Sequence, residues 1–347
     1  MANDSRYLRR ALAAAVIGLS AFATATSAAT ALTTAKHVHW TMATPYGERS
    51  FHTVNIRAFA AEVKAATNGR LTIAVHGAGS LYRHAQIKNA VRAGQVQLGE
   101  FLLSRLANEA PVFEADSVPF LARDYAAAHH LWAVSRPAIE HRLAAQGLVV
   151  LFAVPWPPQG LFSRRPVRNL SDLAGVKFRA YNVASERLAR RLGAVPTQVE
   201  VPDIAQAFLT GRVDAMITSP TTGVNAGAWD FVGYYYDLGA WLPKNVVVVG
   251  ARALAHLAPT LRQAVLAAGR RAEARGWRLS AAETQEKLDT LRHHGVAVLT
   301  PAPELAAGFA RLGRAMADDW AKRAGTEGAA ILRAMRGPTP APTLGPK

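Results

Sequence analysis

The stretch "LVVLFAVPWPPQG" (residues 148–160) decides the fold class and the division of this chain. Its first seven residues, 148–154, are all apolar, which is typical of a strand buried on both faces of a sheet. We therefore expect this strand at the centre of a parallel sheet. Three prolines follow within four positions, and they cannot continue a helix or a central strand. The chain therefore crosses from a first sheet to a second α/β unit at this point.

The segments on either side of this stretch predict how the units are arranged. Upstream, strand and helix patterns alternate, which predicts an α/β domain covered by helices. A second apolar strand, "NVVVVGA" (245–251), follows the second unit and resembles the first one. A long helical pattern over about 258–293 and a last helix over about 303–324 come next. Two crossing points predict two lobes with a cleft between them, which is a common place for a small-molecule site.

The N-terminus has the composition of a secretory signal peptide. Arg6, Arg9 and Arg10 precede an apolar run over 11–22, and small residues follow. The run is shorter than the ~20 residues that a membrane-spanning helix needs. We expect cleavage near Ala28 and a soluble, exported protein, with an uncleaved anchor as the alternative.

Composition excludes some classes of function. The chain of 347 residues has no cysteine, so its fold rests on an ordinary core without disulfides. It has 40 Lys and Arg against 24 Asp and Glu, a net charge of +16. These basic residues are scattered, whereas nucleic-acid binders gather them on one face or stripe. We expect no nucleic-acid partner, although such a basic surface favours anionic ligands.

The sequence has no convincing motif for catalysis or metal binding. "GAGSLY" (77–82) begins like a dinucleotide-binding loop, but Tyr82 stands where the third glycine belongs. No histidines have the spacing of a zinc site, so we expect no metal and no cofactor. Several carboxylates have no partner that the sequence reveals: Glu62, Glu100, Glu109 and Asp116. A binding protein is therefore favoured over an enzyme.

Arg179 lies in an unusual place for a charge. It belongs to "GVKFRAY" (175–181), in which apolar and polar residues alternate as in a half-buried strand. A charge inside an α/β sheet is costly to bury without a partner. Arg179 is therefore solvated, paired within the protein, or placed in a cleft for an anion that the chain does not supply.

Several segments, in this order, resemble the extracytoplasmic solute-binding subunits of TRAP transporters, the DctP family. The similarity in order and spacing extends from about His37 to about Ala324. It implies a two-lobed α/β fold of the periplasmic-binding-protein kind, with a ligand cleft between the lobes and a long helix spanning them. The segments are "HGAGSLYRHAQIKNAVRAGQVQLGEF" (76–101), "FEADSVPFLARDYAAAH" (113–129), "LSDLAGVKFRAYN" (170–182), "LGAVPTQVEVPDIAQAFLTGRVDAMITS" (192–219) and "GAWDFVGYYYDLGAWLPKNVVVVGARAL" (227–254).

The resemblance and the two crossing points together predict the domain boundaries. Residues 1–28 are the signal peptide, and the proline-rich residues 336–347 form a disordered tail. The first lobe comprises residues 29–154 and about 246–290. The second lobe comprises residues 155–245 and about 291–335.

The resemblance also implies a binding site. In this family the arginine of a G-x-K-x-R motif forms a salt bridge with a ligand carboxylate, and here that arginine is Arg179. Gln159 stands roughly where many members have another arginine, and Thr218 and Ser219 stand where many have an asparagine. These departures argue against the sialic acid and C4-dicarboxylates bound by better-known relatives. Aromatic residues complete the expected site, with ordinary core packing as the alternative: Trp156, Tyr181, Trp241, Tyr46 and Phe101.

The function that the resemblance implies is capture of a small organic acid in the periplasm, without catalysis. The protein would deliver this carboxylate to the small and large membrane subunits of a TRAP transporter. Two alternatives remain open. A sensory subunit that presents a carboxylate to a receptor would have the same fold. A secreted hydrolase of small polar substrates is disfavoured because the sequence has no nucleophile motif.

Overall fold

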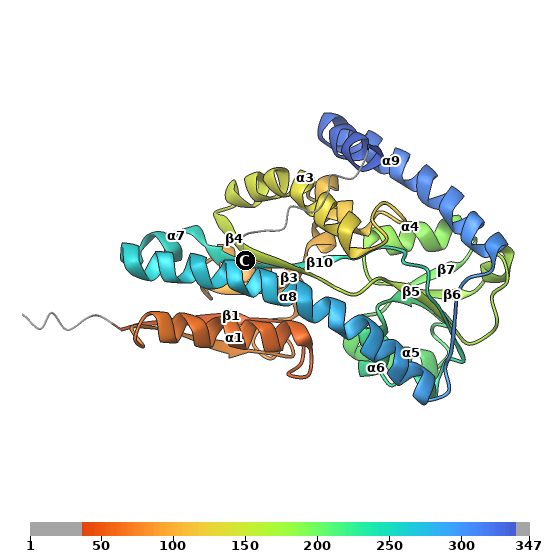
Figure 1. Cartoon of the computed structure of the whole chain (residues 1–347), viewed down its shortest axis with the longest axis horizontal. Helices are drawn as coiled ribbons and strands as arrows, with labels where there is room; N and C mark the ends of the chain where they lie inside the picture. Colours follow the sequence, from red (N-terminus) through yellow and green to blue (C-terminus); the bar gives the residue numbers. More distant parts are fainter. Residues whose placement is uncertain (1–36, 338–347) are drawn as a thin grey trace, which may run out of the picture. The chain divides into compact units, whose positions relative to one another are not determined.

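The computed structural model describes residues 37–337 of the chain. The predicted signal peptide (1–28) lies outside these residues, and so does the predicted tail from residue 338 onward. From Val38 onward the described residues form one compact unit, which contains two separate β-sheets with helices packed around them (Figure 1). The predicted α/β fold class is thereby confirmed.

The first sheet combines parallel and antiparallel strands. β1 pairs parallel with β2 and β3, whereas β10 pairs antiparallel with β3 and β4. The strand order is β2 (Leu71–His76), β1 (Val38–Ala43), β3 (Leu98–Leu102), β10 (Lys244–Gly250) and β4 (Leu148–Pro155).

The predicted position of residues 148–154 at the centre of a parallel sheet is wrong. β4 is the last strand of the first sheet, and its only strand partner in the described chain is the antiparallel β10. Its side chains are nevertheless almost all buried, because α3 (Tyr125–Ala144) and α8 (Pro259–His293) pack against it. An apolar strand therefore indicates covered faces, and helices provide that cover here.

Short helices connect the strands of the first sheet. α1 packs against β2 and α8, and α2 packs against β3. The connecting elements are α1 (Phe51–Ala66), α2 (His84–Arg92), α7 (Ala251–Ala255) and the 3-10 helices η1 (Leu103–Leu106) and η2 (Pro111–Ser117).

The second sheet brings β5, β8 and β6 side by side. β6 pairs parallel with β7 and β8, and β5 pairs antiparallel with β8 and β9. Its order is β11 (Ala297–Leu299), β9 (Tyr234–Tyr236), β5 (Gly160–Ser163), β8 (Ala215–Thr218), β6 (Lys177–Ala180) and β7 (Val195–Gln198). Its helical elements are α4 (Val183–Arg191), α5 (Ile204–Leu209), α6 (Pro220–Asn225), η3 (Leu170–Leu173), η4 (Val201–Asp203) and η5 (Ala228–Asp230).

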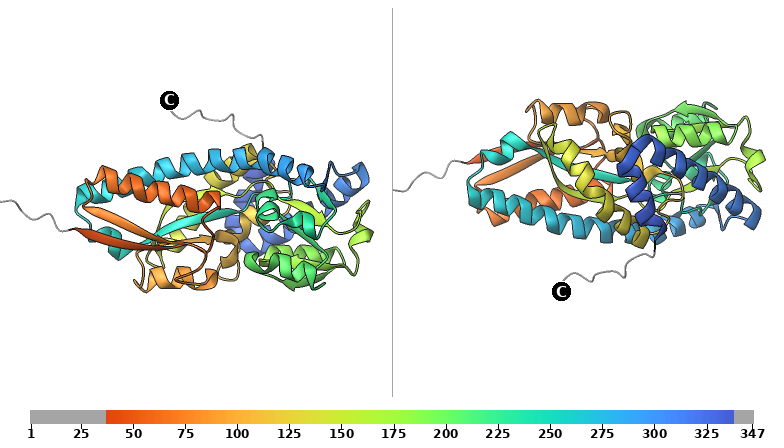
Figure 2. Two further views of the ribbon diagram at one scale, coloured as in Figure 1. Left: turned by 90° about the horizontal axis from the view of Figure 1, so that it is seen from below. Right: turned by 90° about the horizontal axis from the view of Figure 1, so that it is seen from above.

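The helix α8 packs against both sheets and corresponds to the long helix that was predicted to span the two lobes. It packs against α1 and β4 at the first sheet and against α6 and β11 at the second (Figures 1 and 2). Two glycines allow its close approach to β4. A Cβ on Gly269 would lie 3.1 Å from the Leu151 carbonyl oxygen, and one on Gly276 would lie 2.3 Å from the Val154 side chain.

The last helix is longer than predicted. α9 extends over Pro303–Arg336, with a break at Gly325, whose φ of 65° and ψ of −145° are not helical. The sequence-based end at Ala324 lies one residue before this break. Beyond it, Ile331 and Leu332 join the apolar cluster that contains Leu131 of α3.

The two crossing segments are hydrogen-bonded to each other. The Trp156 N–H donates to the Pro243 carbonyl at 2.8 Å, and the Gln159 N–H donates to the Trp241 carbonyl at 2.9 Å. In return, the Ala240 N–H donates to the Gln159 carbonyl at 2.8 Å. This ladder fixes the backbone between the two sheets, where the candidate site lies.

Candidate functional site

A pocket that encloses about 320 Å³ of space, open solvent included, lies where the two sheets face each other. Seven of the nine predicted site residues line it. The lining residues are Tyr46, Leu102, Trp156, Gln159, Arg179, Tyr181, Val201, Thr218, Ser219, Thr222 and Pro243.

Arg179 provides the charge of this cavity. Its side chain is only 1% exposed, although the alternating pattern of its strand is typical of a half-buried one. Its Nε donates to the Val199 carbonyl oxygen at 3.0 Å, and its guanidinium lies 5.0 Å from the centre of the Tyr181 ring. No carboxylate within residues 37–337 lies within ion-pair distance of it. The guanidinium is therefore a buried cation without an ion-pair partner in the described part of the chain.

The electrostatics of Arg179 follow from this burial. Loss of water around the guanidinium lowers the pKa of Arg179 to about 10, while Tyr181 and Glu200 partly oppose the effect. The side chain still carries its charge at neutral pH. An anion that enters the cavity would form the ion pair that Arg179 lacks, and a carboxylate matches the planar fork of a guanidinium with two parallel hydrogen bonds.

The polar groups of the cavity come from three neighbouring strands of the second sheet. Thr218 ends β8 and pairs in register with Gly160, so Gln159 lies beside it. Arg179 lies near the carboxyl end of β6, which runs parallel to β8. Ligands of α/β sheets commonly bind beyond the carboxyl ends of the strands. The order β5-β8-β6 therefore places Gln159, Thr218 and Arg179 at one edge.

The two hydroxyl groups predicted at this edge differ in availability. The Ser219 hydroxyl accepts from the Thr222 N–H at 3.1 Å and lies 3.0 Å from the Thr222 hydroxyl, so it caps α6. The Thr218 hydroxyl makes no hydrogen bond within the described chain, although Thr218 is buried. Of the two, Thr218 has the free hydroxyl.

Tyr46 and Trp156 form an aromatic wall on the side of the first sheet. The Tyr46 hydroxyl and the Trp156 Nε1–H both donate to Asn245 Oδ1, at 3.2 and 3.1 Å. Asn245 Nδ2 in turn donates to Glu100 Oε1 at 2.9 Å. The orientation of both rings therefore depends on a buried amide behind them.

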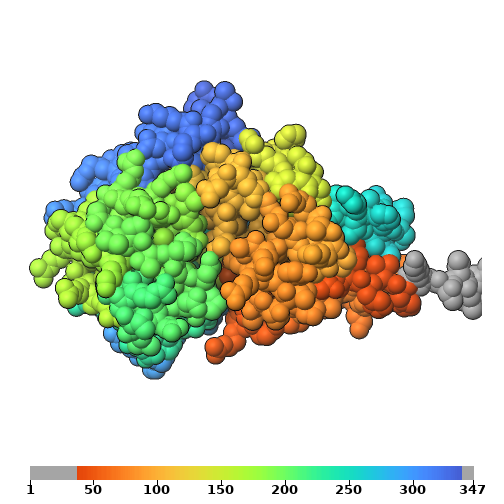
Figure 3. Space-filling view, turned by 180° about the vertical axis from the view of Figure 1, so that it is seen from behind, coloured from red at the N-terminus to blue at the C-terminus, as the bar shows by residue number. Residues whose placement is uncertain are grey.

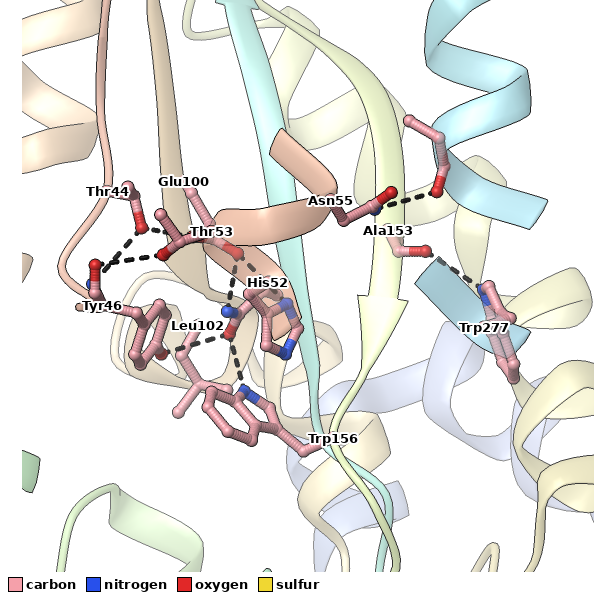
Figure 4. Close-up of polar contacts among 12 residues, drawn as sticks. Thr44, Tyr46, His52, Thr53, Asn55, Glu100, Leu102, Ala153, Trp156 and Trp277 are labelled. Atoms are coloured by element: carbon pink, nitrogen blue, oxygen red, sulfur yellow. Dashed lines mark hydrogen bonds and ion pairs between the residues drawn. The ribbon is translucent and has the colours of Figure 1, made fainter. Parts of the chain in front are cut away.

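Glu100 has partners that the sequence did not reveal. It accepts from the Thr44 hydroxyl at 2.5 Å, and His52 Nδ1 lies 3.2 Å from Glu100 Oε1 (Figure 4). The other three carboxylates considered unpaired also have cationic partners: Glu62 with Arg271 and Arg275, Glu109 with Lys88, and Asp116 with Lys244.

Two predicted residues do not line the cavity. Trp241 lies behind the lining, where its Nε1–H donates to the Tyr181 hydroxyl at 2.9 Å. Phe101 packs into the apolar core with Ile87 and Val248. Successive side chains of a strand point to opposite faces, and the next residue, Leu102, lines the cavity instead.

Four residues that line the cavity were not predicted from the sequence: Leu102, Val201, Thr222 and Pro243. Asn245 and Glu100, which hold the aromatic wall from behind, were not predicted as site residues either. The available signal for Asn245 was a polar residue at the start of an otherwise apolar strand. The chain gives no comparable signal for Glu100, because its partners lie in distant segments.

Polar contacts join the two sheets beside the cavity. Arg105 Nη1 of η1 lies 2.9 Å from Glu200 Oε1, at the start of η4. Asn182 Nδ2, at the start of α4, donates to the Ser104 hydroxyl at 2.8 Å. In Figure 3 the green and orange parts of the chain, which carry these two sets of residues, meet along a seam. The structure is therefore in a state in which the two sides contact each other.

The described residues contain no group of three or more His, Cys, Asp or Glu side chains that could hold a metal ion. No helix there is long and apolar enough to cross a membrane.

Comparison with known proteins identifies the family. Residues 42–323 match the bacterial extracellular solute-binding proteins of family 7, DctP. The chain belongs to this family. The DctP-family resemblance inferred from the sequence is thereby confirmed.

Solved structures of other DctP-family proteins share this fold. DctP7 of Bordetella pertussis, described as an extracytoplasmic solute receptor binding pyroglutamic acid, is 45% identical, with a TM-score of 0.84, over 86% of this chain and all of that one. A marine metagenome TRAP solute-binding protein, described as specific for pyroglutamate, is 35% identical, with a TM-score of 0.84, over 87% of this chain and 99% of that one. The two-lobed fold is thereby confirmed. A solute-binding protein of Albidiferax ferrireducens is 27% identical over 51% of this chain, a match that spans about half (53%) of that protein.

Proposed function

We propose that this DctP-family protein captures a small carboxylate in the periplasm and delivers it to the small and large membrane subunits of a TRAP transporter. The observation that carries the proposal is Arg179, a buried cation that lines the cavity and has no ion-pair partner among the described residues. A cation in such a site binds an anion more strongly than an exposed one does, because the surroundings screen the charge less.

The composition of the cavity supports binding without catalysis. Its lining contains no Asp, Glu or His, which are the side chains that most often act as general bases. The Ser219 hydroxyl is committed to the cap of α6. The tyrosine phenols stay neutral, because burial raises the pKa of both Tyr46 and Tyr181.

Pyroglutamate is the ligand that we propose first. The two solved relatives at 45% and 35% identity are described as binding it. Gln159, where many family members have another arginine, adds no second charge, which suits a ligand with a single carboxylate. The aromatic wall of Tyr46 and Trp156 suits a compact ring.

A thermal-shift screen of small carboxylates tests this proposal. At a concentration of about 100 Kd, a bound ligand adds about 2.7 kcal/mol to the free energy of unfolding. We expect L-pyroglutamate to raise the Tm by roughly 5 °C, and its primary amide, which lacks the carboxylate charge, to leave the Tm unchanged. If no carboxylate raises the Tm and an uncharged sugar does, carboxylate capture is the wrong function.

The ion pair between Arg105 and Glu200 should slow release of the ligand from the wild-type protein, because it joins the two sides of the cavity. Glu200 also acts electrostatically on Arg179, so its negative charge weakens the field that holds an anion. If only this field mattered, Glu200→Gln would slow ligand release. We expect the opposite, a dissociation rate about 2- to 5-fold faster, because the substitution removes a partly exposed ion pair worth up to ~1 kcal/mol that holds the two sides together.

Stopped-flow measurement of Trp fluorescence gives this rate. Arg190→Gln is the matched control, because Arg190 pairs with Glu186 within α4 and makes no contact across the seam. The control variant should release ligand at the wild-type rate. An unchanged or slower dissociation rate for Glu200→Gln would show that the Arg105–Glu200 ion pair does not hold the two sides of the cavity together.

A further inference from the structure

The side-chain amide of Gln159 has a fixed orientation. Gln159 is 3% exposed, and its backbone is held on both sides by the ladder between the crossing segments. Its Nε2 donates one hydrogen to the Pro157 carbonyl oxygen at 2.9 Å. A carbonyl oxygen can only accept, so the nitrogen of the amide must face Pro157 and the oxygen must point the other way.

The other end of this amide, Oε1, accepts no hydrogen bond within the described chain, although Gln159 lines the cavity. An amide oxygen in a largely buried side chain is costly to leave without a donor. Gln159 therefore presents an unused acceptor to the cavity.

The other polar groups of the cavity do not supply this donor. The Tyr46 hydroxyl and the Trp156 N–H are engaged by Asn245. Arg179 brings only donors, and these suit the carboxylate of the ligand. An ionised carboxylate has no hydrogen to give to an amide oxygen. Thr218 and Tyr181 also bring hydroxyl groups to the lining, but neither forms a hydrogen bond with Gln159 in this structure. A second group of the ligand, one with a hydrogen to donate, would therefore satisfy Gln159 Oε1.

We propose that Gln159 is a specificity-determining residue, whose Oε1 accepts a hydrogen bond from an N–H of the ligand. The chemical class is a cyclic acid that carries an amide N–H beside its carboxylate. Such an acid places an anion on Arg179 and a donor on Gln159, two groups that project from neighbouring parts of one sheet edge. This inference rests on the proposed function, because it assumes that a carboxylate is bound by Arg179.

Two ligands that differ only in the N–H group test the hydrogen bond to Gln159 Oε1. L-pyroglutamate carries the ring N–H, and the matching lactone acid has a ring oxygen in its place with nearly the same shape and charge. With wild type, calorimetric titration should show a preference for the lactam of about 5- to 100-fold, the range expected for leaving a buried acceptor unpaired.

Gln159→Met removes the acceptor and keeps the length of the side chain. In this variant the lactam preference should fall to within about 3-fold, while the affinity for the lactone stays near the wild-type value because Arg179 is intact. Gln206→Met is the matched control, since Gln206 is exposed on α5. It should keep both affinities.

Four other results would contradict this inference, and each points to a different conclusion. If wild type binds both acids equally, Gln159 does not select an N–H, although carboxylate capture stands. If Gln159→Met keeps the lactam preference, another residue provides the acceptor. If it loses affinity for both acids equally, Gln159 acts through the fold alone. If wild type binds neither acid and no other carboxylate, the proposed function itself is wrong.

Discussion

Arg179→Ala should weaken binding of the preferred carboxylate by roughly 30-fold to several thousand-fold. Removal of one partner from a buried charge pair costs about 2–5 kcal/mol, and ~1.4 kcal/mol corresponds to a tenfold change in Kd. The burial of Arg179, which has no ion-pair partner among the described residues, favours the upper part of this range. Calorimetric titration of wild type and variant with the same acid measures the effect.

Two further variants separate charge from geometry. Arg179→Lys should also bind poorly, because an ammonium on a flexible stem cannot form two parallel hydrogen bonds with a carboxylate. Arg179→Met retains much of the volume and removes the charge. Its affinity for the acid should be close to that of Arg179→Ala.

Thermal stability without ligand is the control for these variants. The low pKa of Arg179 means that burial disfavours its charged form by a few kcal/mol, at about 1.4 kcal/mol per pKa unit. Arg179→Met should therefore melt at or above the wild-type Tm when no ligand is present. If it melts much earlier and keeps full affinity, Arg179 stabilises the fold and does not hold the ligand.

Asn245→Leu should lower the free energy of unfolding by about 3–5 kcal/mol, although leucine nearly matches asparagine in shape. The substitution leaves the Tyr46 hydroxyl and the Trp156 N–H without their acceptor, and Glu100 loses a donor. Each buried polar group left unpaired costs about 1–3 kcal/mol, and more where a charge is involved. Urea unfolding measures the change.

The same variant should also lose affinity for the ligand, because the aromatic wall is no longer held in place. Asn89→Leu is the matched control, since Asn89 is exposed on α2. Its stability should change by less than about 0.5 kcal/mol. A loss below about 1 kcal/mol for Asn245→Leu would mean that this buried network contributes little.

Much of the fold was predictable from local pattern. The proline-rich crossing after residue 154 separates the two sheets, and the helical pattern over about 258–293 matches α8 (Pro259–His293) closely. The position of β4 was not predictable in the same way. Apolar composition shows that both faces of a strand are covered, but it does not show whether neighbouring strands or helices such as α3 and α8 provide the cover.

The candidate site was only partly predictable. Arg179 and Gln159 were found through family resemblance, whereas the period-two pattern alone left Arg179 either solvated or buried. Asn245 and Glu100 are 145 residues apart in the chain. A single sequence gives no information on such pairs, because only the folded sheet brings them together.

A crystal structure of the protein with the carboxylate that stabilises it most tests the central claim most directly. We expect both carboxylate oxygens to lie about 2.7–2.9 Å from the terminal nitrogens of Arg179, inside the cavity lined by Trp156, Tyr181 and Thr218. A carboxylate bound away from this cavity, with Arg179 still unpaired or paired with a protein carboxylate, would contradict the account.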